Sequence, residues 1–68
     1  MKLSARNQIK GKIVEVTRGA TTSHVRIDIG GPVVTASITN ESVDELNLVA
    51  GKEAYAIIKA SDVMVAVN

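Results

Sequence analysis

Three short segments of the sequence bring hydrogen-bond donors and cations together. They are Ser4-Ala5-Arg6-Asn7 near the start, Thr39-Asn40-Glu41-Ser42 in the middle, and Lys59-Ala60-Ser61 near the end. A fully ionised tetrahedral oxyanion presents only acceptors, so it requires hydroxyl and backbone N–H donors with one or two cations. Together the segments predict an oxyanion site. Each alone also has an ordinary interpretation: a flexible N-terminus, helix caps and a solvated strand end.

Other kinds of site find little support in the sequence. There is no Cys, and His24 is the only His, so thiolate and His-rich metal sites are excluded. Asp28 lies four residues after His24 on a predicted strand, too far for an easy hydrogen bond. No segment matches the phosphate-binding P-loop pattern. We therefore predict no catalytic residues, no bare metal cation and no enzyme activity, with His24 on a solvated strand face or at an interface.

The size and composition predict a protein that associates with itself. The 68 residues make a single domain, 1–68, with no Cys, Phe or Trp and one Tyr, Tyr55. A core this small rarely supplies more than about 3–5 kcal/mol, so such domains usually need a disulfide, a metal or a partner subunit. Because the first two are absent, we expect a homo-oligomer whose subunits share a core of Val, Ile, Leu and Ala.

Charge and hydropathy argue against nucleic-acid and membrane partners. The net charge is about +1, with acids and bases mixed along the chain, so no strong field for nucleic acid is expected. No apolar run approaches the ~20 residues of a membrane span. The opening residues 1–6 contain no apolar signal core, which predicts a cytoplasmic protein.

The hydrophobic periodicity predicts an all-β fold. Alternating patterns indicate strands over 9–17, 22–30, 33–38, 53–59 and 62–67, and the phase slip near Gly11 predicts a bulge or bend in the first. Ser42 and Glu45 have capping-box spacing, which predicts a short helix of one or two turns with Ser42 as its N-cap, ending before Gly51. This order predicts an OB-like five-stranded barrel with one short helix between strands 3 and 4.

The donor segments also carry a resemblance that spans essentially the whole chain. The sequence resembles the molbindin (Mop) family, the small molybdate-binding proteins, whose domain is also called TOBE-like. The matching positions are Ser4-Ala5-Arg6-Asn7, Gly11, Val14, Gly30-Gly31, Ala36-Ser37-Ile38-Thr39, Ser42, Leu46, Leu48, Gly51 and Ile58-Lys59-Ala60-Ser61.

The resemblance implies a function and a site. It implies an OB-like barrel that binds molybdate, or tungstate, at subunit interfaces of a homohexamer built as three dimers, and that serves as an intracellular molybdate store or buffer. Arg6 and Lys59 are expected to reach one anion from different subunits. The implied anion-binding residues are Ser4, Ala5, Arg6, Thr39, Ser42, Lys59, Ala60 and Ser61.

Two alternatives belong to other functional classes. The first is a regulatory module that senses an anion and acts on a partner protein. The second is nucleic-acid binding, which OB folds often perform by stacking bases on aromatic side chains in a positive groove. The single aromatic residue and the small net charge make the second alternative the weaker one.

Overall fold

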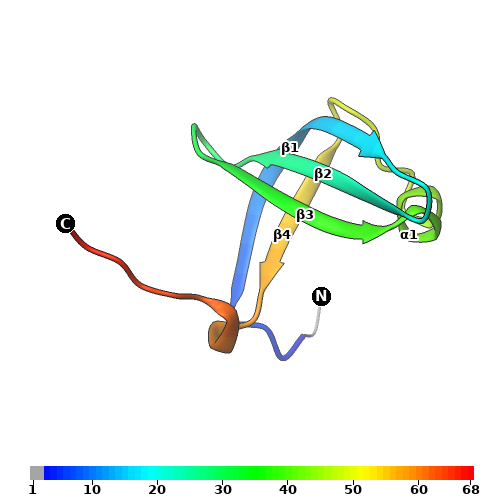
Figure 1. Cartoon of the computed structure of the whole chain (residues 1–68). Coiled ribbons are helices and arrows are strands. Elements are labelled where there is room, and N and C mark those ends of the chain that lie inside the picture. The colour runs from blue at the N-terminus through cyan, green and yellow to red at the C-terminus, as the bar shows by residue number, and fades with distance from the viewer. Residues whose placement is uncertain (1–2) are drawn as a thin grey trace.

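A four-stranded antiparallel sheet forms the body of the protein. The computed structural model describes residues 3–68, with the strand order β3-β2-β1-β4 (Figure 1). Within these residues no helix is long and apolar enough to cross a membrane. The elements in chain order are β1 (Asn7–Arg18), β2 (Thr22–Asp28), β3 (Val33–Thr39), α1 (Asn40–Glu45), β4 (Glu53–Ile58) and the 3-10 turn η1 (Ala60–Asp62).

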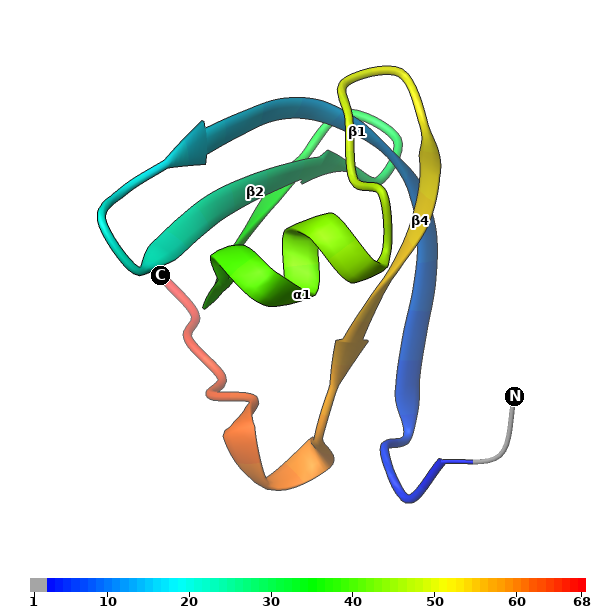
Figure 2. The same cartoon turned by 90° about the vertical axis from the view of Figure 1, so that its right-hand side faces the viewer.

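The long strand β1 curls the sheet because its two halves have different partners. Residues 7–12 pair with β4, whereas residues 12–18 pair mainly with β2. The register with β2 shifts between Ile13 and Glu15, so Val14 is an extra residue. A bulge of this kind bends a strand and increases its twist. The predicted bulge is confirmed, and the sheet bends around the helix (Figure 2). This curled sheet with one short helix is consistent with an OB-like fold.

The loop before β4 braces the bend in β1. The Ile13 N–H donates to the Lys52 carbonyl oxygen at 2.9 Å, and the Gly51 N–H donates to the Ile13 carbonyl oxygen at 2.7 Å. Gly51 has φ +94, a left-handed conformation that glycine adopts without a steric penalty. The backbone of Ile13 therefore stays hydrogen-bonded where the register of the β1–β2 ladder slips.

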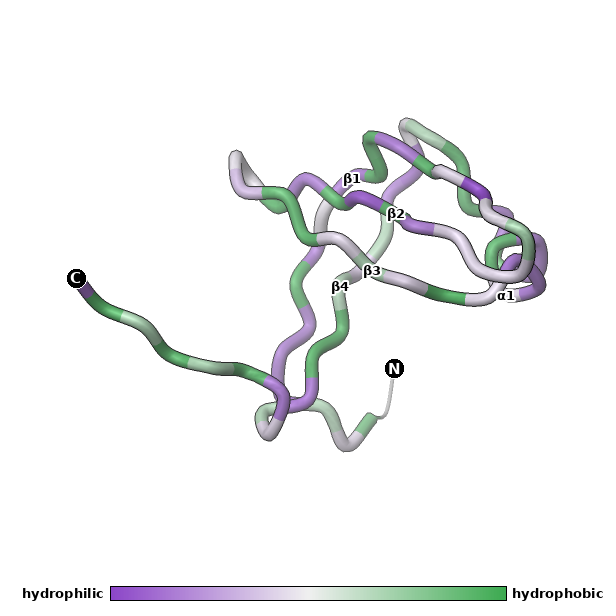
Figure 3. The backbone as a smooth tube through the Cα atoms, in the orientation of Figure 1, coloured by the Kyte–Doolittle hydropathy of each residue, from purple (hydrophilic) through white to green (hydrophobic). Residues whose placement is uncertain are grey.

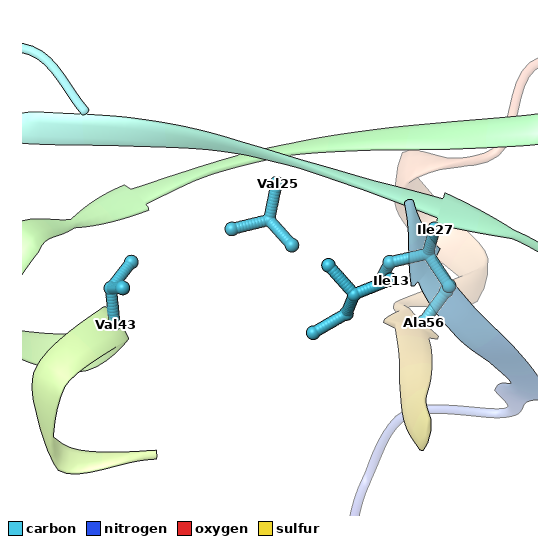
Figure 4. Packing of buried hydrophobic residues seen from close by; sticks show 5 residues of the cluster. All are labelled: Ile13, Val25, Ile27, Val43 and Ala56. Carbon is cyan, nitrogen blue, oxygen red and sulfur yellow. The ribbon is translucent and has the colours of Figure 1, made fainter. Parts of the chain in front are cut away.

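The core inside the curl is thin. Among the described residues, only a few hydrophobic side chains are fully buried, and all are aliphatic. They come from β1, β2, α1 and β4 and point toward one another (Figure 4). This is consistent with the expectation that a single copy lacks a complete core. The buried hydrophobic residues are Ile13, Val25, Ile27, Val43 and Ala56.

The helix begins earlier than the capping-box pattern predicted. Thr39, rather than Ser42, is the N-cap: its Oγ1 accepts a hydrogen bond from the Ser42 N–H at 3.1 Å. Thr39 still has extended backbone angles because it is the last residue of β3, so strand and helix join with no loop between them. The prediction was wrong because Thr39 offers an equivalent hydroxyl three residues upstream.

The predicted fifth strand over 62–67 is absent from this chain. The described residues contain four strands, and the chain after η1 runs as an extended ribbon that leaves the sheet (Figure 1). A period-2 pattern identifies residues suited to a strand, but pairing requires a neighbouring edge, which the sequence pattern does not show. The five-stranded barrel is therefore corrected to a curled four-stranded sheet with a free C-terminal tail.

Candidate functional site

The first and last donor segments meet at one end of the β1–β4 ladder. Asn7 pairs with Ile58, and the Asn7 side-chain amide also donates to the Ile58 carbonyl oxygen at 3.1 Å. Arg6 immediately precedes this pair and Lys59 immediately follows it. Figure 1 shows the N-terminal segment and η1 together at this end. We call residues 4–6 and 59–61 the ladder-end cluster.

The ladder-end cluster carries positive charge that no acid neutralises through an ion pair in the described part of the chain. Within residues 3–68, Arg6 and Lys59 make no ion pair, and both are exposed. Asp62 is only three residues from Lys59, yet it does not come within ion-pair distance. Its backbone N–H instead closes η1 by donating to the Lys59 carbonyl oxygen at 2.9 Å. Two cations, with Ser4 and Ser61 two residues from them along the chain, are residue types that suit an anion.

The middle donor segment forms a second cluster at the start of α1. The Thr39 hydroxyl donates to Ser42 Oγ at 2.9 Å and accepts from the Ser42 N–H. The proton of Thr39 is thus used within the cap, whereas the Ser42 hydroxyl keeps its own proton for an outside acceptor. Thr39 therefore positions Ser42 more than it offers a donor itself. We call Thr39 and Ser42 the cap cluster.

The cap cluster is held in place by Asn40, which lies in the middle donor segment but was not among the predicted anion-binding residues. The Asn40 side-chain amide donates to the Gly19 carbonyl oxygen at 3.0 Å, and its backbone N–H donates to the Thr21 carbonyl oxygen at 3.0 Å. Its Oδ1 accepts from the buried hydroxyl of Ser23. No local motif reveals this role, because Asn40 joins the helix start to the β1–β2 turn.

Two acids lie beside the cap cluster, and only one of them has its negative charge paired with a cation. The guanidinium of Arg18 donates to both carboxylate oxygens of Asp44, at 2.9 and 3.4 Å, and this hydrogen bonding and charge lower the pKa of Asp44. Glu41 is exposed and borders a hollow of about 370 Å³ beside Thr39. That hollow is lined by a carboxylate and no cation, so the cap cluster alone does not make an anion site. It needs cations from elsewhere.

The two clusters lie at opposite ends of β1. Arg6 precedes its first residue, whereas Thr39 pairs with Thr22, just beyond the pairing of Arg18 with Ser23 at its last residue. The views in Figures 1 and 2 both show η1 and the N-terminal segment away from the start of α1. One chain therefore places the segments 4–6 and 59–61 at the same end of the β1–β4 ladder, and Thr39 and Ser42 at the other end of β1.

This arrangement changes one expectation about how subunits divide the site. Arg6 and Lys59 were expected to reach one anion from different subunits because the family's sites lie between subunits. The β1–β4 register makes them neighbours in one chain. Within a single chain, it is the cap cluster that lies far from the two cations.

Metal chemistry finds no support in the described part of the chain. No three His, Cys, Asp or Glu residues gather closely enough within it to hold an ion. His24 is exposed on β2, where it pairs with Thr17 and Ser37. The Asp28 carboxylate is hydrogen-bonded to the turn that follows it: its Oδ1 accepts from the N–H groups of Gly30 and Gly31 at 2.9 and 2.8 Å. The Gly31 and Gly30 amides lower the pKa of Asp28 accordingly.

Known proteins share both the sequence and the fold of this chain. The TOBE domain model matches residues 3–65. A Haemophilus influenzae protein described as a molybdenum-pterin-binding protein is 56% identical over 69 residues, covering all of both chains. The structure of a molybdate-binding protein from Sporomusa ovata has a TM-score of 0.93 at 33% identity, and the match covers 97% of this chain and 98% of the other.

A third relative was crystallised with its ligand. The cytoplasmic molybdate-binding protein ModG, in a form with molybdate bound, has a TM-score of 0.90 at 40% identity. The match covers 94% of this chain and 46% of ModG. Because the family model spans nearly the whole chain and the relatives agree with it, the chain belongs to the TOBE-domain family and, as its donor segments predicted, to the molbindin (Mop) proteins.

Proposed function

We propose that this protein binds molybdate, or tungstate, at interfaces between its own copies, and that it serves as an intracellular store or buffer of the anion. The observation that carries the proposal is the division of donors: the cations lie in the ladder-end cluster, and the cap cluster lies at the other end of β1. A site that uses both clusters requires two chains. Binding by the named relatives and their whole-chain similarity support the choice of anion.

Each cluster contributes different chemistry to this shared site. The Arg6 guanidinium and the Lys59 ammonium of one copy offset the two negative charges of the anion. The hydroxyls of Ser4 and Ser61 and the backbone N–H groups at Ala5 and Ala60 donate further hydrogen bonds. The Ser42 hydroxyl of a second copy, oriented by Thr39, donates to a further oxygen. Because the anion is bound intact and no nucleophile or general base is assigned, no reaction is catalysed. Release follows the free anion concentration.

The assembly proposed for this function is a homohexamer of three dimers. In such an assembly every off-axis interface site is repeated six times by symmetry. The thin core of each copy favours association. Sensing for a partner protein would use the same anion site and remains the second function to which this site is suited.

Anion selectivity tests the proposal. In competition calorimetry near neutral pH, molybdate and tungstate are expected to displace phosphate, with phosphate at least about tenfold weaker. The reason is that a site of donors leaves the proton of hydrogen phosphate without an acceptor, and an unsatisfied buried donor costs about 1–3 kcal/mol. Sulfate has the hydrogen-bonding needs of molybdate but is smaller, so it measures the effect of size separately. Equal affinities for phosphate and molybdate would contradict the proposed site.

A further inference from the structure

The helix that carries the cap cluster is acidic. Glu41, Asp44 and Glu45 make up half of α1, all three are exposed, and the helix contains no Lys or Arg. Figure 3 shows hydrophilic residues along this helix. Ser42 lies between them, and a helix rises only about 1.5 Å per residue. Charges act on one another over a Debye length of about 8 Å at physiological ionic strength. An anion held by Ser42 therefore experiences the field of these acids.

Only one of the three acids is paired with a cation in the described part of the chain. The Arg18 guanidinium donates to both carboxylate oxygens of Asp44, at 2.9 and 3.4 Å. Within residues 3–68, neither Glu41 nor Glu45 forms an ion pair. The helix therefore keeps negative charge that is not offset by an ion pair, on both sides of Ser42 along the chain.

A second cation near α1 is bound to backbone carbonyls at the far end of the helix. The Lys52 ammonium donates to the carbonyl oxygens of Leu46 and Asn47, at 2.6 and 3.3 Å. It therefore satisfies the C-terminal end of the helix and does not neutralise Glu41 in the first turn. An acid in the first turn stabilises a helix through the macrodipole. The effect of Glu41 on stability and its effect on a bound anion thus have opposite signs.

We propose that the acids of α1 lower the affinity of the site for its anion, and that Arg18 limits this effect by neutralising Asp44. The inference rests on the proposed function, which places the anion at Ser42. The carboxylates repel the anion, and they also attract the cations that the ladder-end cluster of the other copy brings to it. Arg18 acts on the anion through Asp44 and does not contact it. Weaker binding lets the anion exchange at a higher free concentration, which suits a buffer.

Glu41→Gln removes one of these charges and keeps the size of the side chain. In titration calorimetry of the full chain with molybdate at low salt, it is expected to bind the anion about threefold to tenfold more tightly. Raising the salt to about 1 M shortens the Debye length to about 3 Å and should remove the difference. Glu15→Gln, which removes a carboxylate from an ion pair on β1, is the matched control and should bind like the wild type.

The two partners of the Arg18–Asp44 ion pair separate the effect of charge from that of a mechanical tether. Arg18→Met is expected to weaken molybdate binding about threefold to tenfold, because it leaves Asp44 without its cation. Asp44→Asn is expected to strengthen binding, and the double variant should return close to the wild type. A tether that merely holds α1 in place predicts weaker binding in both single variants. Arg26→Met breaks the ion pair with Glu15 and is the matched control.

The outcomes distinguish this inference from the proposed function. If the wild type binds molybdate and both Glu41→Gln and Arg18→Met bind it equally well, the inference is overturned and the proposed function stands. Weaker binding in Asp44→Asn would overturn it in favour of the tether. If the wild type binds no molybdate, the proposed function is contradicted and the inference falls with it. Urea unfolding checks that each variant folds, and Glu41→Gln decides the matter if Arg18→Met does not.

Discussion

Arg6→Ala and Lys59→Ala are each expected to weaken molybdate binding about tenfold to a hundredfold, measured by titration calorimetry. Each change removes a charged hydrogen bond, which contributes roughly 1.5–3 kcal/mol. Arg26→Ala and Lys10→Ala remove the same charges elsewhere on the sheet, where the side chains pair with Glu15 and Glu53, and serve as controls. Unchanged affinity in both site variants would show that the ladder-end cluster does not bind the anion.

Mixing variant subunits shows how two chains divide the site. When Arg6→Ala and Ser42→Ala chains are co-assembled, some interfaces combine an intact ladder-end cluster with an intact cap cluster, so about a quarter of the sites should regain wild-type affinity if assembly is random. The mixture of Arg6→Ala with Lys59→Ala should regain none, because the β1–β4 register places both residues in one chain. Recovery in the second mixture but not in the first would contradict this division.

Gly11→Ala is expected to lower the free energy of unfolding by about 2–3 kcal/mol, a large part of what a domain of this size has available. A Cβ at Gly11 would lie 2.5 Å from the Asp28 carbonyl oxygen and 2.7 Å from Ile27 Cγ2. The first contact is with backbone, so relief requires β1 and β2 to move apart next to the bulge. Lys12→Ala, at the next and exposed position of β1, is the matched control.

Urea unfolding at one fixed protein concentration measures this effect, since the apparent stability of an assembly depends on concentration. The midpoint for Gly11→Ala should fall well below those of the wild type and Lys12→Ala. If Gly11→Ala matched Lys12→Ala, the close approach of β1 to β2 would not be what requires glycine at this position.

Local patterns were sufficient to predict most of the fold. The alternation of Val25 and Ile27 with polar neighbours predicted β2, and Gly30-Gly31 predicted the turn after it, where both residues have positive φ. The phase slip in β1 predicted the bulge, although the extra residue is Val14 rather than Gly11. These features depend on residues close together in the chain, which is why sequence periodicity reveals them.

Features that depend on distant residues could not be predicted in this way. The pairing of Asn7 with Ile58 joins segments 51 residues apart. The Val pattern over 62–67 predicted a strand, but a strand requires a neighbouring edge, and the structure shows none beside these residues. For the same reason, the sequence identified the donor segments but not which of them one chain brings together.

Native mass spectrometry with and without molybdate tests the central claim most directly, because it measures subunit number and bound anions together. The proposed function predicts a homohexamer that gains the mass of several molybdate ions, in numbers set by its symmetry, and gains fewer phosphate ions at the same subsaturating concentration. A folded monomer at micromolar concentration, or a hexamer whose mass does not change with molybdate, would contradict the claim that this protein binds molybdate between its own copies.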